Sequence, residues 1–271
     1  MGAVQGTQSS PGSPESSDAL RIIAEFPAVR PELADARAAI DAVLWNRQIR
    51  ARAQEVARAS VADGARASAA MDGADLVIPD DSPMGRVLDA ALAVTAQAGA
   101  CERQWSTAPL QVLAGMQVQV ARSLGGTDEP GRPRSDEVVD DPLHLGALPT
   151  AAEVPQRLAQ LGRTLTASTD APALVLAAVV HGEIQILRPF AQGSGLIARA
   201  TVRCTLMQRG VDPSLFTIPE LGMSMLGRPA YVAALRAYSS GSPAGMSDYL
   251  VWFARALSLG AQAVSQRFNN S

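Results

Sequence analysis

Residues 187–199 read LRPFAQGSGLIAR, and this stretch predicts a turn that leads into a helix. Two glycines, Gly193 and Gly195, flank the small polar Ser194, and a helical pattern follows them. Glycine allows positive φ and a close approach of a ligand to the backbone. The first amides of a helix have no intrahelical partner and carry the positive end of its dipole. The turn is therefore a predicted anion-binding site.

The same stretch lacks most of the side chains that catalytic sites use. It contains no His, Asp, Glu or Cys. The whole chain has no Lys, because all 23 of its basic residues are Arg. The sequence thus predicts the frame of a binding site without the groups that would perform general acid–base chemistry there.

The stretch resembles the signature of the Fic/Doc (Fido) family, which reads His-Pro-Phe-x-Asp/Glu-Gly-Asn-Gly-Arg-x-x-Arg. The positions that match are Pro189, Phe190, Gly193, Gly195 and Arg199. The positions that depart are Arg188 in place of His, Gln192 in place of the acid, Ser194 in place of Asn and Leu196 in place of the first Arg. The active-site motif is therefore degenerate.

Two further features resemble the same family. The helix expected before the signature carries His181 seven residues ahead of Arg188, where the family typically has a His. Far upstream, residues 68–73 read SAAMDG and resemble the Ser/Thr-x-x-x-Glu-Gly/Asn motif of members with an inhibitory helix. In that motif Ser68 and Gly73 match and Asp72 replaces Glu. The resemblance spans about residues 35–260.

The resemblance implies the roles of these positions. In active members the signature His takes a proton from a protein hydroxyl, which then attacks the α-phosphate of ATP so that AMP is transferred. The acid holds Mg²⁺, the Gly-Asn-Gly amides cradle phosphate, and the first Arg holds the outer phosphates. The last Arg meets the outer phosphate or the inhibitory acid, which predicts an ion pair between Asp72 and Arg199. The alternative is that these two residues are separate exposed charges.

At the departing positions the residue chemistry differs. A guanidinium stays protonated, so Arg188 cannot act as a general base. A neutral amide at Gln192 is a poor Mg²⁺ ligand. Leu196 removes a bidentate phosphate donor.

Several residues keep two interpretations. Arg188 is either structural or anion-binding, and Ser194 belongs either to an anion-binding turn with Gly193, Gly195 and Arg199 or to a turn without a ligand. His181 is either a core histidine or a replacement base. We assign no catalytic residue and no metal ligand, and ATP and Mg²⁺ are implied by the family alone.

Composition sets the class of protein. A hydrophobic content of 47% with 18% charged residues favours a globular chain, and a net charge of −3 without a basic block disfavours nucleic-acid binding. We see neither a signal peptide nor an apolar run long enough for a membrane, so we expect a cytoplasmic protein. A protein target or regulatory partner is expected, and the sequence does not indicate the oligomeric state.

The predicted fold is all-α, a Fic-like helical bundle with a small β-hairpin flap. Helices are expected from about residue 31 to 70, at 84–98, 109–124 and 150–165, before the signature, and in two or three segments after it. The flap falls within the Gly- and Pro-rich residues 125–149, near the family's Gly-x-x-Arg at 131–134. The expected organisation is a disordered tail (1–20), an N-terminal helical region with the inhibitory-like motif (21–98), a Fic-like core (99–260) and a C-terminal tail (261–271).

Three functions remain open from the sequence. The first is a catalytically impaired Fic-fold protein that retains nucleotide, anion or protein binding. The second is an active nucleotidyltransferase with a rearranged site. The third is a purely structural helical interaction domain.

Overall fold

The computed structural model describes residues 18–76, 78–125 and 129–269, and within them every regular element is a helix. The all-α prediction is confirmed. Residues 1–17 of the tail predicted at 1–20 lie outside the described residues. Asp18 caps the first helix by accepting a hydrogen bond from the Leu20 amide. The helices are α1 (Ala19–Ala24), α2 (Val29–Trp45), α3 (Arg47–Ala51), α4 (Ala53–Met71), α5 (Pro83–Ala98), α6 (Glu102–Thr107), α7 (Pro109–Leu124), the 3₁₀ turn η1 (Ala151–Glu153), α8 (Val154–Thr166), α9 (Ala173–Leu187), α10 (Ser194–Gln208), α11 (Pro219–Met225), α12 (Arg228–Ser239) and α13 (Pro243–Asn269).

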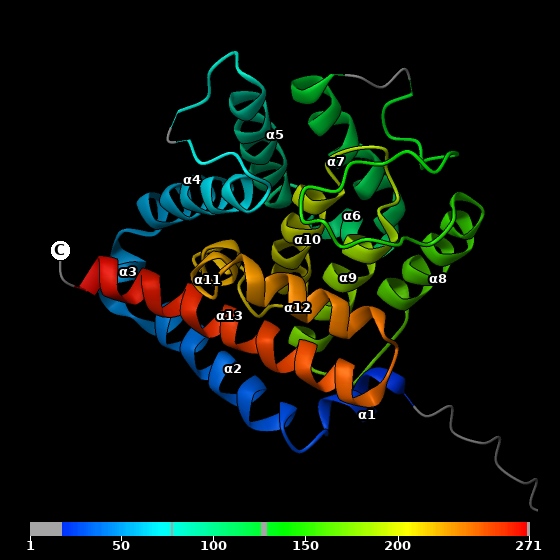
Figure 1. The fold of residues 1–271 in the computed structure, drawn as a ribbon. Coiled ribbons are helices and arrows are strands. Elements are labelled where there is room, and N and C mark those ends of the chain that lie inside the picture. Colours follow the sequence, from blue (N-terminus) through cyan, green and yellow to red (C-terminus); the bar gives the residue numbers. More distant parts are fainter. Residues whose placement is uncertain (1–17, 77, 126–128, 270–271) are drawn as a thin grey trace, which may run out of the picture.

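A central hairpin of α9 and α10 carries the signature turn. Nearly every residue of both helices is buried, because other helices cover them on all sides. A helix that is apolar around its circumference belongs in the middle of a core. Figure 1 shows α10 near the middle of the molecule, with α4, α5 and α7 on one side and the long α13 lying along α2 on the other. The turn between α9 and α10 is therefore held by the most buried elements of the fold.

Two hydrophobic clusters flank this hairpin. One joins α1–α3 and the start of α4 to α11–α13, and it includes Val202 and Leu206 of α10. The other joins the end of α4 to α5–α8, and it includes Ile197 and Cys204 of α10. Helix α4 and the hairpin contribute to both clusters, so they connect the two halves of the core.

The helix expected from about residue 31 to 70 is interrupted. It forms α2, α3 and α4, with breaks at Asn46 and Arg52. The Asn46 side chain accepts hydrogen bonds from the amides of Gln48 and Ile49 at 2.8 and 3.2 Å. Asn competes in this way with the helical hydrogen bonds and caps a new helix. The predicted end of α4 agrees, since Gly73 follows it with φ of +93°.

The expected β-hairpin flap is not present in the described part of residues 125–149. This segment is irregular, and two of its backbone amides bond the signature turn instead: Arg134 donates to the Pro189 carbonyl at 2.7 Å and Asp140 to the Ala191 carbonyl at 3.0 Å. Prolines remove the donors that a strand ladder needs. The segment contains four, at positions 130, 133, 142 and 149. We call residues 129–149 the flap loop.

Two of the expected boundaries lie within the described residues. Residue 260 lies inside α13, which continues to Asn269, so residues 261–269 are helical. The junction at residue 98 is where α5 ends, but α5 packs on both α4 and α7. None of the helices in the described ranges is sufficiently long and apolar to span a bilayer.

Candidate functional site

The signature turn has left-handed backbone at both of its ends. Arg188 ends α9 in the left-handed region, with φ of +42°, and Gly193 precedes α10 with φ of +72°. A left-handed residue other than glycine costs about 1 kcal/mol or more, so contacts elsewhere must hold Arg188 in place. Buried Arg134 supplies them, because its Nε donates to the Arg188 carbonyl at 2.8 Å and its Nη2 to the Pro149 carbonyl at 2.6 Å. Arg134 thus joins the end of α9 to the flap loop.

A carboxylate of the chain itself lies at this turn. Oδ2 of Asp140, on the flap loop, accepts a hydrogen bond from the Gly193 amide at 3.1 Å. Burial raises the pKa of Asp140 above its ordinary value, while the Gly193 amide acts in the opposite direction. The Gly193 amide, for which the family resemblance predicts phosphate binding, therefore already donates to a carboxyl group of the chain.

The neighbouring Asp141 meets the residue at the family's base position. Nη2 of Arg188 lies 2.7 Å from Oδ1 of Asp141, and Arg188 is 4% exposed. Burial opposes ionisation of Asp141, but the amides of Leu145 and Gly146 together with Arg188 hold its pKa below the ordinary value. Nη1 of Arg188 is buried without a hydrogen-bond partner in the described ranges.

The other three positions that depart from the family signature, Gln192, Ser194 and Leu196, make structural contacts. The Gln192 side-chain amide donates to the Gly125 carbonyl at the end of α7. Ser194 Oγ accepts a hydrogen bond from the Phe190 amide and lies 3.3 Å from the Phe190 carbonyl, which closes the turn. Leu196 is 1% exposed and packs in the core.

The predicted ion pair between α4 and α10 is confirmed. Arg199 Nη2 donates to Oδ2 of Asp72 at 2.7 Å, and the Arg199 side chain has no exposure. Its Nε donates to Ser68 Oγ at 2.7 Å and its Nη2 also reaches the Ser68 carbonyl at 3.1 Å. Burial disfavours the guanidinium, but the Asp72 charge and the hydrogen bonds hold the pKa of Arg199 above its ordinary value. Gly195 lies beside this pair, since a Cβ there would be 3.2 Å from the Asp72 carboxylate.

His181 lies in the core, away from the turn's donors. Its Nδ1 is 2.8 Å from the Tyr249 hydroxyl, and its Nε2 is 2.8 Å from the Tyr231 hydroxyl. Burial, together with the Arg199 charge, lowers the pKa of His181 to about 3. Both ring nitrogens are occupied and the residue has no exposure. The geometry agrees with a core histidine.

The free space at the turn is small. The cleft lined by Asp140, Arg188, Ser194 and Gly195 has a volume of about 10 Å³, which is about the space of one water molecule. Across residues 18–76, 78–125 and 129–269, no group of three His, Cys, Asp or Glu side chains is placed to hold a metal ion. The free space at the turn is therefore too small for a nucleotide in this conformation.

The sequence did not predict the two acidic residues that contact the signature turn, nor one buried ion pair. Asp140 and Asp141 belong to the flap loop, and their only sequence signal was an acidic doublet in a Gly- and Pro-rich segment. Arg203 on α10 forms a buried pair with Glu220 at 2.7 Å and also donates to Ser60 Oγ. Its position one turn after Arg199 was the available signal for a second contact with α4.

Comparisons with known proteins identify the fold. No protein-family model matches the sequence, and no curated protein matches it significantly. Among solved structures, a Fic family protein from Desulfovibrio desulfuricans G20 is similar with a TM-score of 0.70 at 19% identity, over 89% of this chain and 75% of that one. Fic-1 from C. elegans is similar with a TM-score of 0.66 at 18% identity, over 89% of this chain and 72% of that one. At this identity the likeness shows the fold.

Proposed function

We propose that this chain, which has the Fic fold, is a catalytically impaired member of that fold that acts by binding a protein partner. The observation that supports the catalytic impairment is the Asp140 carboxylate on the Gly193 amide. An anion-binding turn whose donor already holds an internal carboxylate must lose that contact before it binds a phosphate. The flap loop thus acts as a plug, by which we mean that Asp140 occupies the Gly193 amide of the signature turn.

The chemistry of the turn supports loss of AMP transfer. Arg188 stands at the base position and cannot accept a proton. General-base catalysis contributes about 10²–10⁴ in rate, so its loss alone would leave a trace of activity. Gln192 is engaged with the Gly125 carbonyl and Leu196 is buried, so the metal ligand and a phosphate donor are missing as well. Three separate contributions to transfer are absent together.

The contact between α4 and α10 supports a structural role for the inhibitory-like motif. In the resembled family, the last signature Arg meets either the outer phosphate or the inhibitory acid. Here Arg199 is enclosed by Asp72 and Ser68. With few other phosphate ligands left, the pair acts as a permanent clamp between the two helices.

A rearranged active nucleotidyltransferase has less support. It needs a base at the turn, and His181 is enclosed by two tyrosine hydroxyls with its pKa lowered to about 3 by burial. ATP and Mg²⁺ are accordingly not assigned as ligands of this chain.

The test combines binding and transfer measurements. Calorimetry with ATP and Mg²⁺ is expected to give no heat with the natural chain, and α-labelled ATP is expected to leave no label on protein. A restored variant should regain both. It combines the replacements Arg188→His, Gln192→Glu, Ser194→Asn and Leu196→Arg with Asp72→Ala and Asp140→Ala.

Two controls make the result interpretable. The same four signature replacements with Asp72 and Asp140 intact should transfer less AMP, because the clamp and the plug remain. Circular dichroism establishes that each variant is folded. Label transfer by the natural chain, or a folded restored variant that neither binds ATP nor transfers AMP, would contradict the proposal.

A further inference from the structure

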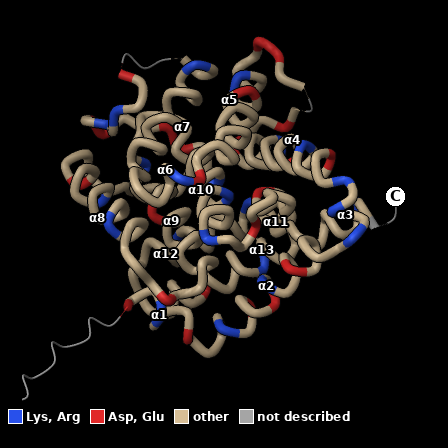
Figure 2. The backbone as a smooth tube through the Cα atoms, turned by 180° about the vertical axis from the view of Figure 1, so that it is seen from behind, with Lys and Arg blue, Asp and Glu red and all other residues tan. Residues whose placement is uncertain are grey.

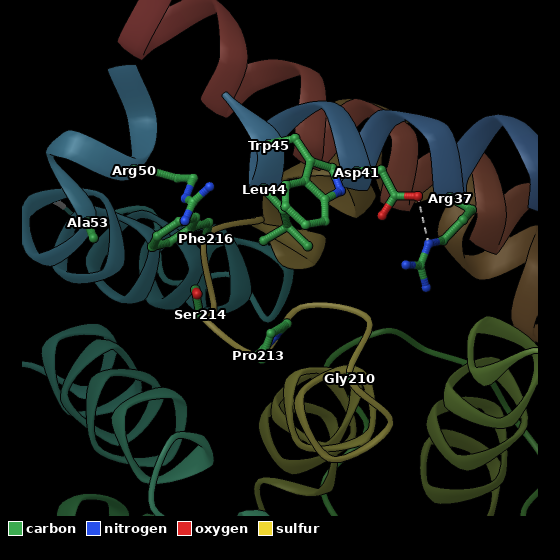
Figure 3. Close-up of a pocket in the computed structure, with 10 residues that line it drawn as sticks. All are labelled: Arg37, Asp41, Leu44, Trp45, Arg50, Ala53, Gly210, Pro213, Ser214 and Phe216. Atoms are coloured by element: carbon green, nitrogen blue, oxygen red, sulfur yellow. Dashed lines mark hydrogen bonds and ion pairs between the residues drawn. The ribbon is translucent and has the colours of Figure 1, made fainter. Parts of the chain in front are cut away.

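A pocket of about 390 Å³ lies between α2, α3, the start of α4 and the loop 210–216. Its apolar wall consists of Leu44, Trp45 and Phe216, and Figure 3 shows the Trp45 ring and Phe216 facing the same space. Pockets of about 300–1,000 Å³ with apolar walls and a few polar groups are typical of binding sites. None of its residues takes part in the signature turn.

Trp45 is unusually exposed for a tryptophan. Its exposure is 73%, whereas the other two tryptophans, Trp105 and Trp252, are 1% and 8% exposed. The Arg50 guanidinium lies 5.9 Å from the centre of the Trp45 ring, which is within cation–π distance and helps to hold the ring. Exposed tryptophan is enriched among the residues that dominate protein–protein binding.

The rim of the pocket is cationic. Arg37 is neutralised by Asp41 through a 2.9 Å ion pair, and Arg52 is paired with Glu55. Arg50 and the nearby exposed Arg47 and Arg58 make no carboxylate contact within the described ranges. Figure 2 shows several arginine positions gathered around α3. A second hollow adjoins the pocket, because Arg50 and Ala53 line both.

We infer that this pocket binds an acidic linear segment of a partner protein, with one bulky apolar side chain against Trp45 and Phe216 and carboxylates on Arg50 and its neighbours. Complementary charge favours an acidic ligand. The two adjoining hollows suit an extended segment more than a compact molecule. A nucleic acid or an anionic membrane carries negative charge over an area larger than the arginine cluster around α3. The rest of this chain, whose net charge is −3, would repel that charge. This inference does not depend on the function proposed for the signature turn.

A peptide selection tests the inference. A library of random dodecapeptides is selected on the natural chain and counter-selected on the Trp45→Ala variant. Enriched peptides are expected to carry Asp or Glu around one aromatic or large aliphatic residue. The consensus peptide should change the fluorescence of Trp45, and its Kd should rise about tenfold or more in Trp45→Ala and in Arg50→Glu.

Matched controls separate this site from general effects. Met225→Ala removes another exposed apolar side chain, 54% exposed on α11, and Arg163→Glu reverses an exposed charge on α8. Neither should alter the Kd. The inference would be overturned if no peptides were enriched, if the enriched peptides had no acidic bias, or if the control variants lost as much affinity. It would also be overturned if an RNA oligonucleotide or phosphatidylserine vesicles, in place of the peptide, bound through Trp45 and Arg50.

Discussion

At the scale of single residues, the least expected feature is how many arginines are buried. Arg199, Arg203, Arg134 and Arg188 are each at most 6% exposed, and each bonds carbonyls, hydroxyls or carboxylates of a distant segment. The planar guanidinium offers five donors, so one side chain links several groups at once. In a chain without Lys, these arginines link the core helices to segments that are distant in the sequence.

Removing one partner of the Asp72–Arg199 pair is expected to be costly. Asp72→Ala leaves a buried guanidinium without its carboxylate partner, and breaking a buried pair in this way costs about 3–5 kcal/mol. Urea denaturation measures the change in the free energy of unfolding. As a control, Asp41→Ala removes the exposed partner of Arg37 and should cost about 1 kcal/mol or less. Equal effects of the two substitutions would contradict the structural clamp.

His181 predicts a pH dependence of stability. The unfolded chain binds a proton at this residue near pH 6.5, but burial lowers the folded-state pKa to about 3. The unfolded state therefore binds more protons between these values, so the free energy of unfolding is unaffected above pH 6.5 and falls as the pH drops toward 3. The slope from this residue is at most about 1.4 kcal/mol per pH unit.

Urea denaturation at about pH 7 and about pH 5 measures that slope. His181→Gln should reduce it, whatever the substitution does to stability at neutral pH. His144→Gln, which changes the other histidine of the chain, is the matched control substitution. An unchanged slope in His181→Gln would show that His181 is not the buried neutral group described above.

At the scale of elements, α11 and α13 approach each other through glycine. A Cβ on Gly222 would lie 1.8 Å from the Ala256 carbonyl oxygen, and one on Gly260 would lie 2.2 Å from the Ile218 carbonyl oxygen. These contacts are with backbone atoms, which cannot rotate away. The two glycines thus allow α13 to lie against the segment that follows the central hairpin.

Alanine at Gly260 is expected to destabilise the protein by about 1–3 kcal/mol or more, because the two helices must separate. A matched control is Gly115 in α7, where the nearest atom to a new Cβ is the flexible Gln97 side chain at 3.3 Å. Gly115→Ala should be neutral or stabilising by up to about 1 kcal/mol, as expected for a helix interior. Thermal unfolding of both variants measures the difference, and a stabilising Gly260→Ala would contradict the close packing.

At the scale of the whole molecule, the two hydrophobic clusters share α4, α9 and α10. The N-terminal helices are part of this arrangement, since Leu33, Ile40 and Val43 of α2 pack in the same cluster as Phe253 and Leu257 of α13. An element that contributes to a shared core cannot be removed without exposing apolar surface. The core does not divide at residue 98.

The fragment 99–269 is therefore expected not to fold on its own. It retains the signature turn but lacks α1–α5, which cover α13 and α10. Circular dichroism during heating should show no cooperative transition for the fragment, whereas the full chain should unfold in one transition. A cooperative fragment would instead support an independent core that begins near residue 99.

The sequence predicted well what depends on local chemistry. The apolar periodicity and the Pro and Gly positions predicted α5, α7 and the end of α4. The degenerate signature predicted the turn, and Asp72 with Arg199 predicted the contact between α4 and α10. The predicted hairpin was wrong, because it was transferred from a family while four prolines in this segment remove strand donors.

By itself, then, the sequence determined the helical class, the turn between α9 and α10 and the presence at position 188 of an arginine, which cannot accept a proton. These follow from residue type and spacing along the chain. Only the tertiary structure decided that Asp140 and Asp141 engage that turn, that His181 is enclosed, and that Trp45 lines an open pocket. Each of these depends on segments more than thirty residues apart meeting in space, and no local pattern encodes which buried donor a distant carboxylate will reach.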